Sequence, residues 1–313
     1  MILMGRLKDL LVIVGPTASG KSRLGLGLAG ALGGEIISAD AFAVYRGMDI
    51  GTDKPGREDR RKIRHHLIDI LNPDQLYSAG DFARRASVLI QEIQASGRTP
   101  IIVGGTHFYI EALVKGLCPT PPREDEIRKK LEDAWKENPE ALRRQLRTVD
   151  PESAARIPAA DRQRILRALE VHEITGESLS EHWRKQDRQP AYHPLYLSPL
   201  RAREELYDRI NTRVDAMFAG GFVAEVQALL GAGFSPDSHA FKAIGYREIV
   251  QMIESGSKLR EVIEAVKRSS RRLAKRQITW LRHHQESDLH HLSTDQRGIE
   301  EGLRLWKTFR DSE

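Results

Sequence analysis

Eight residues near the N-terminus have the spacing of a phosphate-binding loop. The segment Gly15-Pro16-Thr17-Ala18-Ser19-Gly20-Lys21-Ser22 matches the pattern GxxxxGK[ST] and follows an apolar run at 10–14. Its two glycines let the backbone curl so that N–H groups point at phosphate oxygens. Lys21 would neutralise a terminal phosphate, and the Ser22 hydroxyl would bind Mg²⁺. This nucleotide-binding motif, typical of ATP-binding proteins, predicts a polyphosphate site; the alternative is a glycine-rich turn without a ligand.

One carboxylate is missing where a nucleotide-hydrolysing enzyme would hold Mg²⁺, at the end of another strand. The best later strand candidate, at 100–105, is followed by Thr106 and contains no acid. Asp40 and Asp69 end other apolar runs and could serve in its place. The phosphate loop is therefore predicted to hold a diphosphate that leaves, with no terminal phosphoryl group to transfer.

Two polar residues are predicted beside the phosphate loop. Asp40 ends the strand candidate at 35–40, and Thr106 follows the one at 100–105. Ligands of open α/β sheets bind at this carboxyl edge, where a carboxylate can take a proton from an incoming nucleophile. The alternatives are a helix N-cap for Asp40 and an ordinary turn residue for Thr106. The histidine pair at 65–66 lacks a third ligand at metal spacing, so it is interpreted as structural or surface-exposed.

Positive charge is concentrated in one predicted helix. Residues 267–282 contain seven Lys and Arg side chains and no acid. Ala274, Ile278 and Leu281 form a stripe that is predicted to be buried, whereas the arginines at 268, 272 and 276 share another face. Like charges four residues apart repel each other, so they predict an anionic partner; the alternative is a solvated face. A second basic cluster lies at 162–167.

The elements that must position these residues show α/β alternation. Strand candidates at 10–14, 35–40, 67–70 and 100–105 are separated by helical patterns such as 78–96. This alternation predicts a parallel sheet flanked by helices, and the phosphate loop after the first strand makes it P-loop NTPase-like.

A change of composition divides the chain. After the proline-rich segment 119–122, charged helical sequence continues to about residue 199, with a strand candidate at 195–197 and prolines marking the return. We therefore predict a core domain at 1–120 and 199–313 with C-terminal helices, and a helical insertion domain at 121–198. Within the insertion, Asp150 and Asp161 are predicted to begin helices, and Gly176 to end one.

Composition limits the class of protein. The chain has 313 residues, 40% of them hydrophobic, which favours about two folded domains, and its net charge of +5 permits nucleic-acid binding. The single cysteine, Cys118, excludes an intrachain disulfide and a multi-cysteine zinc site and favours a reducing compartment. The sequence shows no export signal and no apolar run long enough to span a membrane, so we expect a cytoplasmic protein without a membrane partner.

The ordered set of motifs resembles that of the tRNA dimethylallyltransferases, also called tRNA isopentenyltransferases. The resemblance covers about residues 10–284. It rests on the phosphate loop and on the segments VYRGMDIGT at 44–52, KP at 54–55, HLID at 66–69, YSA at 77–79, DF at 81–82, VGGT at 103–106, QR at 163–164, RALEV at 167–171, IGY at 244–246, AKRQ at 274–277 and TWLR at 279–282.

The resemblance implies transfer of a dimethylallyl group from dimethylallyl diphosphate to N6 of adenosine 37, with release of diphosphate, in tRNAs that read codons beginning with U. It implies a monomer that needs Mg²⁺ and binds the tRNA anticodon stem-loop. Asp40 would be the base, and Thr106 would hydrogen-bond near the reacting centre. The phosphate loop and one or both of Arg209 and Arg213, chiefly Arg213, would bind the diphosphate. The implied tRNA contacts are Asp40, Ala41, Phe42, Ala43, Thr106, Arg128, Gln163, Arg164, Ile165, Leu166, Arg167, Phe241, Lys242, Ala243, Ile244, Gly245, Tyr246, Arg247, Lys275, Arg276, Gln277, Ile278, Thr279, Trp280, Leu281 and Arg282.

The chain departs from the family pattern at three places, none of which removes an implied catalytic group. Ala41 stands where many members have serine, Ser22 replaces the commoner threonine, and a Ser-Ser-Arg-Arg stretch at 269–272 replaces the usual Thr-Arg stretch. Two other functions stay open. One is a P-loop kinase for a small molecule, and the other is a non-catalytic RNA-binding protein with a vestigial loop, against which the intact polar residues argue.

Overall fold

The computed structural model describes residues 8–185, 190, 192–199, 201–284 and 289–311. Contacts divide the chain into two compact units. The first consists of Met1–Lys115 and Pro190–Glu313, and the second of Gly116–Gln189. The first unit contains the sheet, and the described part of the second contains helices.

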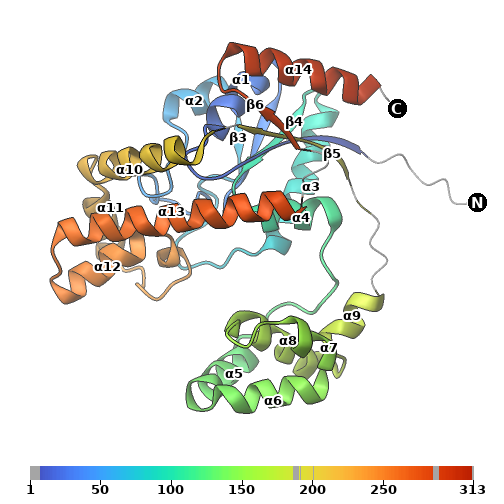
Figure 1. The fold of residues 1–313 in the computed structure, drawn as a ribbon, viewed down its shortest axis with the longest axis vertical. Coiled ribbons are helices and arrows are strands. Elements are labelled where there is room, and N and C mark those ends of the chain that lie inside the picture. Colours follow the sequence, from blue (N-terminus) through green and yellow to red (C-terminus); the bar gives the residue numbers. More distant parts are fainter. Residues whose placement is uncertain (1–7, 186–189, 191, 200, 285–288, 312–313) are drawn as a thin grey trace, which may run out of the picture. The chain divides into compact units, whose positions relative to one another are not determined.

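A six-stranded parallel sheet forms the centre of the first unit (Figure 1). Its strands are β1 (Lys8–Val14), β2 (Glu35–Ala39), β3 (His65–His66), β4 (Pro100–Gly104), β5 (Tyr192–Pro199) and β6 (Leu289–Leu292). Their order is β3-β2-β4-β1-β5-β6, and every neighbouring pair is parallel. Val14 and Ala39 both pair with Gly104, so the loops after β1, β2 and β4 begin at one edge. This sheet confirms the predicted fold class.

Helices cover both faces of the sheet because its central strands are apolar on both sides. Leu11 and Ile13 pack in one hydrophobic cluster with α1 (Lys21–Leu32) and α14 (Gln296–Asp311). Leu10 and Val12 point to the opposite face, where they belong to a cluster with α3 (Ala79–Ala95) and α4 (His107–Lys115). The short helix α2 (Arg57–Lys62) has no buried residue.

Four α-helices extend the cluster on the second face. They are α10 (Arg203–Ala219), α11 (Phe222–Gly231), α12 (Tyr246–Ser255) and α13 (Leu259–His284), with a 3-10 turn at Ala240–Lys242 before α12. Val214, Phe222, Ile249 and Val266 bring one residue from each into this core. Helix α13 lies along α10 and passes the carboxyl edge of the sheet (Figure 1).

The second unit has a hydrophobic core of its own. Its helices are α5 (Asp125–Glu137), α6 (Pro139–Val149), α7 (Pro151–Arg156), α8 (Arg162–Thr175) and α9 (Leu179–Lys185). Leu131, Leu146 and Leu166 are buried among them. Helix α7 begins after the cap Asp150, and α8 begins after Asp161 and ends at Gly176, as the sequence predicts.

Two sequence predictions need correction, and one strand was missed. Residues 67–70 are not a strand, because Leu67 and Asp69 adopt φ values of 61° and 56° that break the extended backbone after β3. Strand β5 pairs with β1, so the first unit resumes at Pro190 and not at the predicted residue 199. The short strand β6 was not predicted; it pairs with β5 at the edge of the sheet.

No single helix in the described ranges is long and apolar enough to cross a membrane. Among the residues that the structure describes, the bent pair formed by α10 and α11 meets the length and composition expected of a membrane span, but its residues Val214, Phe222 and Val226 are buried in the core.

Candidate active site

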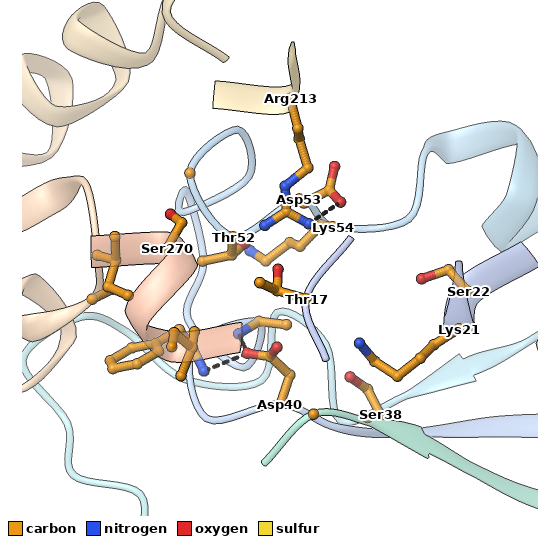
Figure 2. A pocket seen from close by; sticks show the side chains of 18 of the residues that line it. Thr17, Lys21, Ser22, Ser38, Asp40, Thr52, Asp53, Lys54, Arg213 and Ser270 are labelled. Atoms are coloured by element: carbon orange, nitrogen blue, oxygen red, sulfur yellow. Dashed lines mark hydrogen bonds and ion pairs between the residues drawn. The ribbon is translucent and has the colours of Figure 1, made fainter. Parts of the chain in front are cut away.

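A pocket lies at the edge where β1, β2 and β4 end (Figure 2). The phosphate loop contributes Thr17, Lys21 and Ser22, and Asp40 extends the end of β2 into the same space. Arg213 of α10 lines the pocket as well. The structure therefore brings the predicted diphosphate ligands and the predicted base together.

The phosphate loop is shaped by its glycines and ends at a helix N-terminus. Gly20 has a φ of 102°, a left-handed conformation that favours glycine, and α1 begins at the next residue. No acidic side chain lies in the first turn of α1, so the partial positive charge of this helix end stays available to an anion. Five loop residues shape the turn without lining the pocket: Gly15, Pro16, Ala18, Ser19 and Gly20.

Lys21 is the most perturbed cation of the site. Its Nζ donates to the Pro16 carbonyl at 2.8 Å. Burial, and secondly the positive charge of Arg213, lower the pKa of Lys21 to about 8, although Asp40 and Asp53 oppose this change. An anionic ligand would favour the charged ammonium, so Lys21 is suited to respond to a bound phosphate.

Asp40 and Thr106 form a hydrogen-bonded turn. Asp40 Oδ1 accepts from the backbone N–H groups of Phe42 and Ala43 at 2.8 and 3.0 Å. Thr106 Oγ1 accepts from the Ala41 N–H at 3.1 Å, which ties the loop after β4 to the same turn. Asp40 Oδ2 has no hydrogen-bond partner among the described residues. The turn thus holds one carboxylate oxygen and leaves the other to take a proton.

Thr106 lies outside the pocket lining, and the turn around Asp40 contains no helix. Asp40 is consequently not the N-cap of a following helix, which was the alternative interpretation. Phe42 and Ala43 line the pocket beside it, and Phe42 stacks on His239 with ring centroids 5.9 Å apart.

The two arginines of the predicted pair, Arg209 and Arg213, make different contacts. Arg209 donates from Nε to the carbonyl of Ala18 at 2.9 Å and so braces the phosphate loop. Arg213 lines the pocket and pairs there with Asp53 at 2.8 Å (Figure 2). This placement makes Arg213, of the two, the one able to bind a ligand inside the pocket.

A loop between β2 and α2 supplies pocket residues for which sequence reasoning proposed no role. Thr52, Asp53 and Lys54 line the pocket. The Glu225 carboxylate of α11 accepts three consecutive backbone N–H groups of this loop, at residues 49–51. Lys54 is buried and pairs with Asp69 at 2.5 Å. Thr52 and Lys54 lie in the family motifs at 44–52 and 54–55, whereas Asp53 lies between them, and the polar contacts of these residues come from distant parts of the sequence.

The two histidines at 65–66 make structural contacts, and one of them also lines the pocket. His66 Nε2 lies 2.6 Å from Glu35 Oε2, and His65 Nδ1 lies 2.8 Å from the Ile63 carbonyl oxygen. His65 also lines the pocket, and burial lowers its pKa.

Metal binding in this pocket would depend on few protein ligands. In the described ranges, no group of three or more His, Cys, Asp or Glu side chains could hold a metal ion. The exposed Ser22 hydroxyl lies in a pocket that also contains Asp40 and Asp53. The Ser22 hydroxyl fits Mg²⁺, which typically takes one or two protein ligands and completes its shell with phosphate oxygens and water.

Helix α13 separates its charges between two faces. Lys267 pairs with Asp215 of α10 at 2.8 Å, and Arg271 donates to Asn211 of the same helix. The remaining cations of the segment are exposed and have no ion pair within the described part of the chain: Arg268, Arg272, Lys275, Arg276 and Arg282. An exposed stripe of unpaired cations is the feature expected of a surface that binds a polyanion.

Several implied tRNA contacts on α13 are internal. Gln277 is only 9% exposed; its Oε1 accepts from the Thr17 N–H at 2.8 Å, and its Nε2 donates to the Gly105 carbonyl at 2.9 Å. Leu281 is buried, Ile278 packs in an internal cluster, and Trp280 stacks on buried His107 with centroids 4.5 Å apart. Gln277 therefore joins α13 to the phosphate loop, whereas Lys275, Arg276, Thr279 and Arg282 face outward.

The segment 241–247 is also mostly internal. Phe241, Ala243 and Tyr246 are buried, and the Tyr246 hydroxyl donates to Glu225 at 2.5 Å. Burial and the Glu225 charge raise the pKa of Tyr246 far above its ordinary value. A Cβ on buried Gly245 would lie 2.4 Å from Phe222. The outward residues of this segment are Lys242, Arg247 and, in part, Ile244.

The implied tRNA contacts in the second unit are also partly internal and partly exposed. Ile165 and Leu166 are buried in its core and cannot reach a partner. Arg167 donates to Glu170, to Thr120 and to the Pro121 carbonyl, and Arg128 lies 3.1 Å from Glu132. Gln163 and Arg164 are exposed.

A sequence model described as IPP transferase matches residues 43–284. The chain is 49% identical to the tRNA dimethylallyltransferase of Geobacter sulfurreducens, over 89% of this chain and 90% of that protein. It is 44% identical to the tRNA dimethylallyltransferase of Pelotomaculum thermopropionicum, over 89% of each protein.

Solved structures similar to this chain have related names. The full-length tRNA isopentenylpyrophosphate transferase of Bacillus halodurans superposes with a TM-score of 0.69 at 35% identity, covering 98% of this chain and 96% of that one. A eukaryotic dimethylallyltransferase solved acting on tRNA superposes with a TM-score of 0.85 at 27% identity, covering 98% of this chain and 80% of that one.

Proposed function

Because the chain belongs to the IPP transferase family of tRNA dimethylallyltransferases, we propose that it transfers a dimethylallyl group from dimethylallyl diphosphate to N6 of adenosine 37. The substrates are tRNAs that read codons beginning with U, and diphosphate is released. The observation that carries the proposal is the single pocket that joins Lys21 and Arg213 to the Asp40 carboxylate.

The diphosphate side of the reaction uses the phosphate loop. Lys21, the N-terminus of α1 and Arg213 would bind the diphosphate oxygens, whose negative charge grows as the bond from the dimethylallyl C1 to oxygen breaks. Ser22 would hold Mg²⁺, which when bound would neutralise part of that charge. No terminal phosphoryl transfer is needed, which agrees with the lack of an acid at the end of β4.

The acceptor side uses Asp40. The N6 nitrogen of adenine forms the new bond to C1 and loses a proton, and Asp40 Oδ2 is free among the described residues to accept that proton. Phe42 and Ala43, held on Asp40 by hydrogen bonds, place the carboxylate at the pocket. The adenine must leave the anticodon-loop stack to reach this point, which costs a few kcal/mol that contacts elsewhere on the tRNA offset.

The tRNA backbone would bind the exposed stripe of α13. Arg276 belongs both to that stripe and to the pocket lining, so the stripe leads to the site of transfer. Exposed Lys242 and Arg247 in the first unit, and Gln163 and Arg164 in the second, are further proposed contacts. We also propose that the enzyme is a monomer in the cytoplasm; a tRNA substrate together with a single cysteine supports this location.

The test is an incubation of the full chain with Mg²⁺, dimethylallyl diphosphate and a tRNA whose loop residues 36 to 38 are adenosines. Mass analysis of the nucleosides should show N6-dimethylallyladenosine, and an assay of the solution should show released diphosphate. A tRNA with guanosine at position 37 is the matched control. No modified nucleoside here, together with phosphoryl transfer from ATP in a parallel incubation that contains ATP, would instead identify a kinase.

A further inference from the structure

Asp53 is paired with the cation that a diphosphate would need. Its Oδ2 lies 2.8 Å from Nη1 of Arg213, and both side chains line the pocket with Lys21 (Figure 2). The side chains of Asp53 and Arg213 are 55% and 29% exposed, so solvent reaches the pair. A diphosphate that approaches Arg213 therefore meets a carboxylate already bound to it.

The loop that carries Asp53 is anchored independently of Arg213. Glu225 holds the backbone at 49–51 through three N–H groups, and the neighbouring Lys54 is fixed by Asp69. Asp53 itself has a φ of 54°, a left-handed conformation that is uncommon for residues other than glycine. These contacts hold the loop on both sides of Asp53 without involving Arg213.

The negative charge of Asp53 also reaches the phosphate loop. It acts on the Lys21 ammonium, where it raises the pKa against the larger opposite effects of burial and Arg213. The same charge repels a diphosphate bound at Lys21. Asp53 thus opposes diphosphate binding both by occupying Arg213 and by direct repulsion.

We propose that Asp53 is a built-in competitor of diphosphate for Arg213. The carboxylate holds the guanidinium when no ligand is bound, yields it to the diphosphate and recovers it as the product leaves. The inference rests on the proposed function, because it requires a diphosphate in this pocket. Asp53 is a positioning residue that sets how tightly diphosphate is held; it takes no part in bond formation.

The experiment measures the binding of inorganic pyrophosphate to the full chain by titration calorimetry, once at constant Mg²⁺ and once without Mg²⁺. Asp53→Asn removes the charge but keeps the side-chain shape, and asparagine accepts the left-handed backbone. We expect the variant to bind pyrophosphate about fivefold more tightly, the change produced by losing one exposed competing ion pair. In turnover, the KM for dimethylallyl diphosphate should fall and kcat should not rise.

Asp49→Asn is the matched control. Asp49 lies in the same loop and is exposed, but it pairs with Lys54 and not with Arg213, so pyrophosphate affinity should not change. In an Arg213→Gln background, Asp53→Asn should lose most of its effect. Equal thermal midpoints would show that both variants fold.

Unchanged or weaker pyrophosphate binding by Asp53→Asn overturns the inference, and weakening that occurs only with Mg²⁺ present would make Asp53 a metal ligand instead. If the unaltered chain binds no pyrophosphate, the proposed function fails. If it binds pyrophosphate and the variant binds no more tightly, only this inference fails.

Discussion

At the scale of single residues, Asp40 has two oxygens with different environments. Oδ1 accepts two backbone N–H groups and fixes the turn, while Oδ2 is left for the substrate proton. Asp40→Asn keeps the first role, because an amide oxygen also accepts hydrogen bonds, and removes the second. We expect transfer to fall by about 10²- to 10⁴-fold, the usual contribution of a general base, with tRNA binding nearly intact. Single-turnover kinetics and a filter-binding titration measure the two effects.

Thr106→Val is the companion to this experiment. It removes the acceptor for the Ala41 N–H and disturbs the turn without touching the carboxylate, whereas Thr106→Ser keeps the hydroxyl. Recovery of transfer in the serine variant but not the valine variant would assign Thr106 a positioning role. A large loss of tRNA affinity in Asp40→Asn would instead show that Asp40 recognises tRNA.

The lowered pKa of Lys21 gives the free pocket a pH dependence. Because this pKa is about 8, the ammonium loses its proton as the pH rises through that value, and the phosphate loop loses a positive charge. Pyrophosphate affinity should therefore be highest below about pH 8 and fall above it. Calorimetric titrations from neutral to alkaline pH measure the fall.

Arg213→Gln tests the cause of this pH dependence. Arg213 helps to lower the Lys21 pKa, so the variant should bind pyrophosphate more weakly while its inflection moves to higher pH. Titration of pyrophosphate itself is common to both proteins and does not affect the comparison. An inflection at the same pH in both would remove Arg213 as a cause.

Residue types alone indicated the phosphate loop and Asp40, because their chemistry follows from spacing within one short segment or from the end of a strand. Asp53 and Gln277 could not be assigned in this way. Asp53 gains its role from Arg213, which is 160 positions away, and Gln277 from Thr17, which is 260 positions away. Such roles arise only when the chain has folded.

At the scale of elements, α13 combines a core helix with a cationic surface. Its exposed stripe should contact tRNA phosphates, and each such contact contributes to the salt dependence of binding. We expect Arg272→Ala and Arg276→Ala each to reduce the slope of log affinity against log salt by about one unit. Binding titrations over a range of salt concentrations measure the slope.

Lys267→Ala is the control for the stripe, because Lys267 belongs to the same basic segment but pairs with Asp215. The slope of log tRNA affinity against log salt for Lys267→Ala should match that of the unaltered chain. Equal slopes for Arg272→Ala and Lys267→Ala would place the tRNA backbone on another surface.

The sequence predicted elements wherever local signals were complete. The buried stripe of α13 was predicted in part, because Ala274 and Leu281 are buried. Helix α8 has the predicted caps, Asp161 at its start and Gly176 at its end. Residues 67–70 looked like a strand because they are mostly apolar, but left-handed backbone at Leu67 and Asp69 overrides that pattern. The edge strand β6 is too short to produce a periodic signal.

At the scale of the whole molecule, the chain contains two compact units with separate hydrophobic cores. The pocket is lined only by residues of the first unit, and the second unit packs its leucines among its own helices. Pyrophosphate binds only folded pocket residues, so it should stabilise the first unit and raise the temperature at which that unit unfolds. Because the cores are separate, a substitution can weaken the core of the second unit while pyrophosphate binding reports on the first unit.

Leu166→Ala applies this separation to tRNA binding. Leu166 is fully buried in the second unit, so its truncation should destabilise that unit by about 2–5 kcal/mol. Pyrophosphate affinity should not change, because no pocket residue belongs to this core, whereas tRNA affinity should fall if Gln163 and Arg164 of the same helix contact tRNA. Leu28→Ala, in the core of the first unit, is the matched control and should lower the unfolding temperature that pyrophosphate raises. Loss of pyrophosphate binding in Leu166→Ala would show that the pocket depends on the second unit after all.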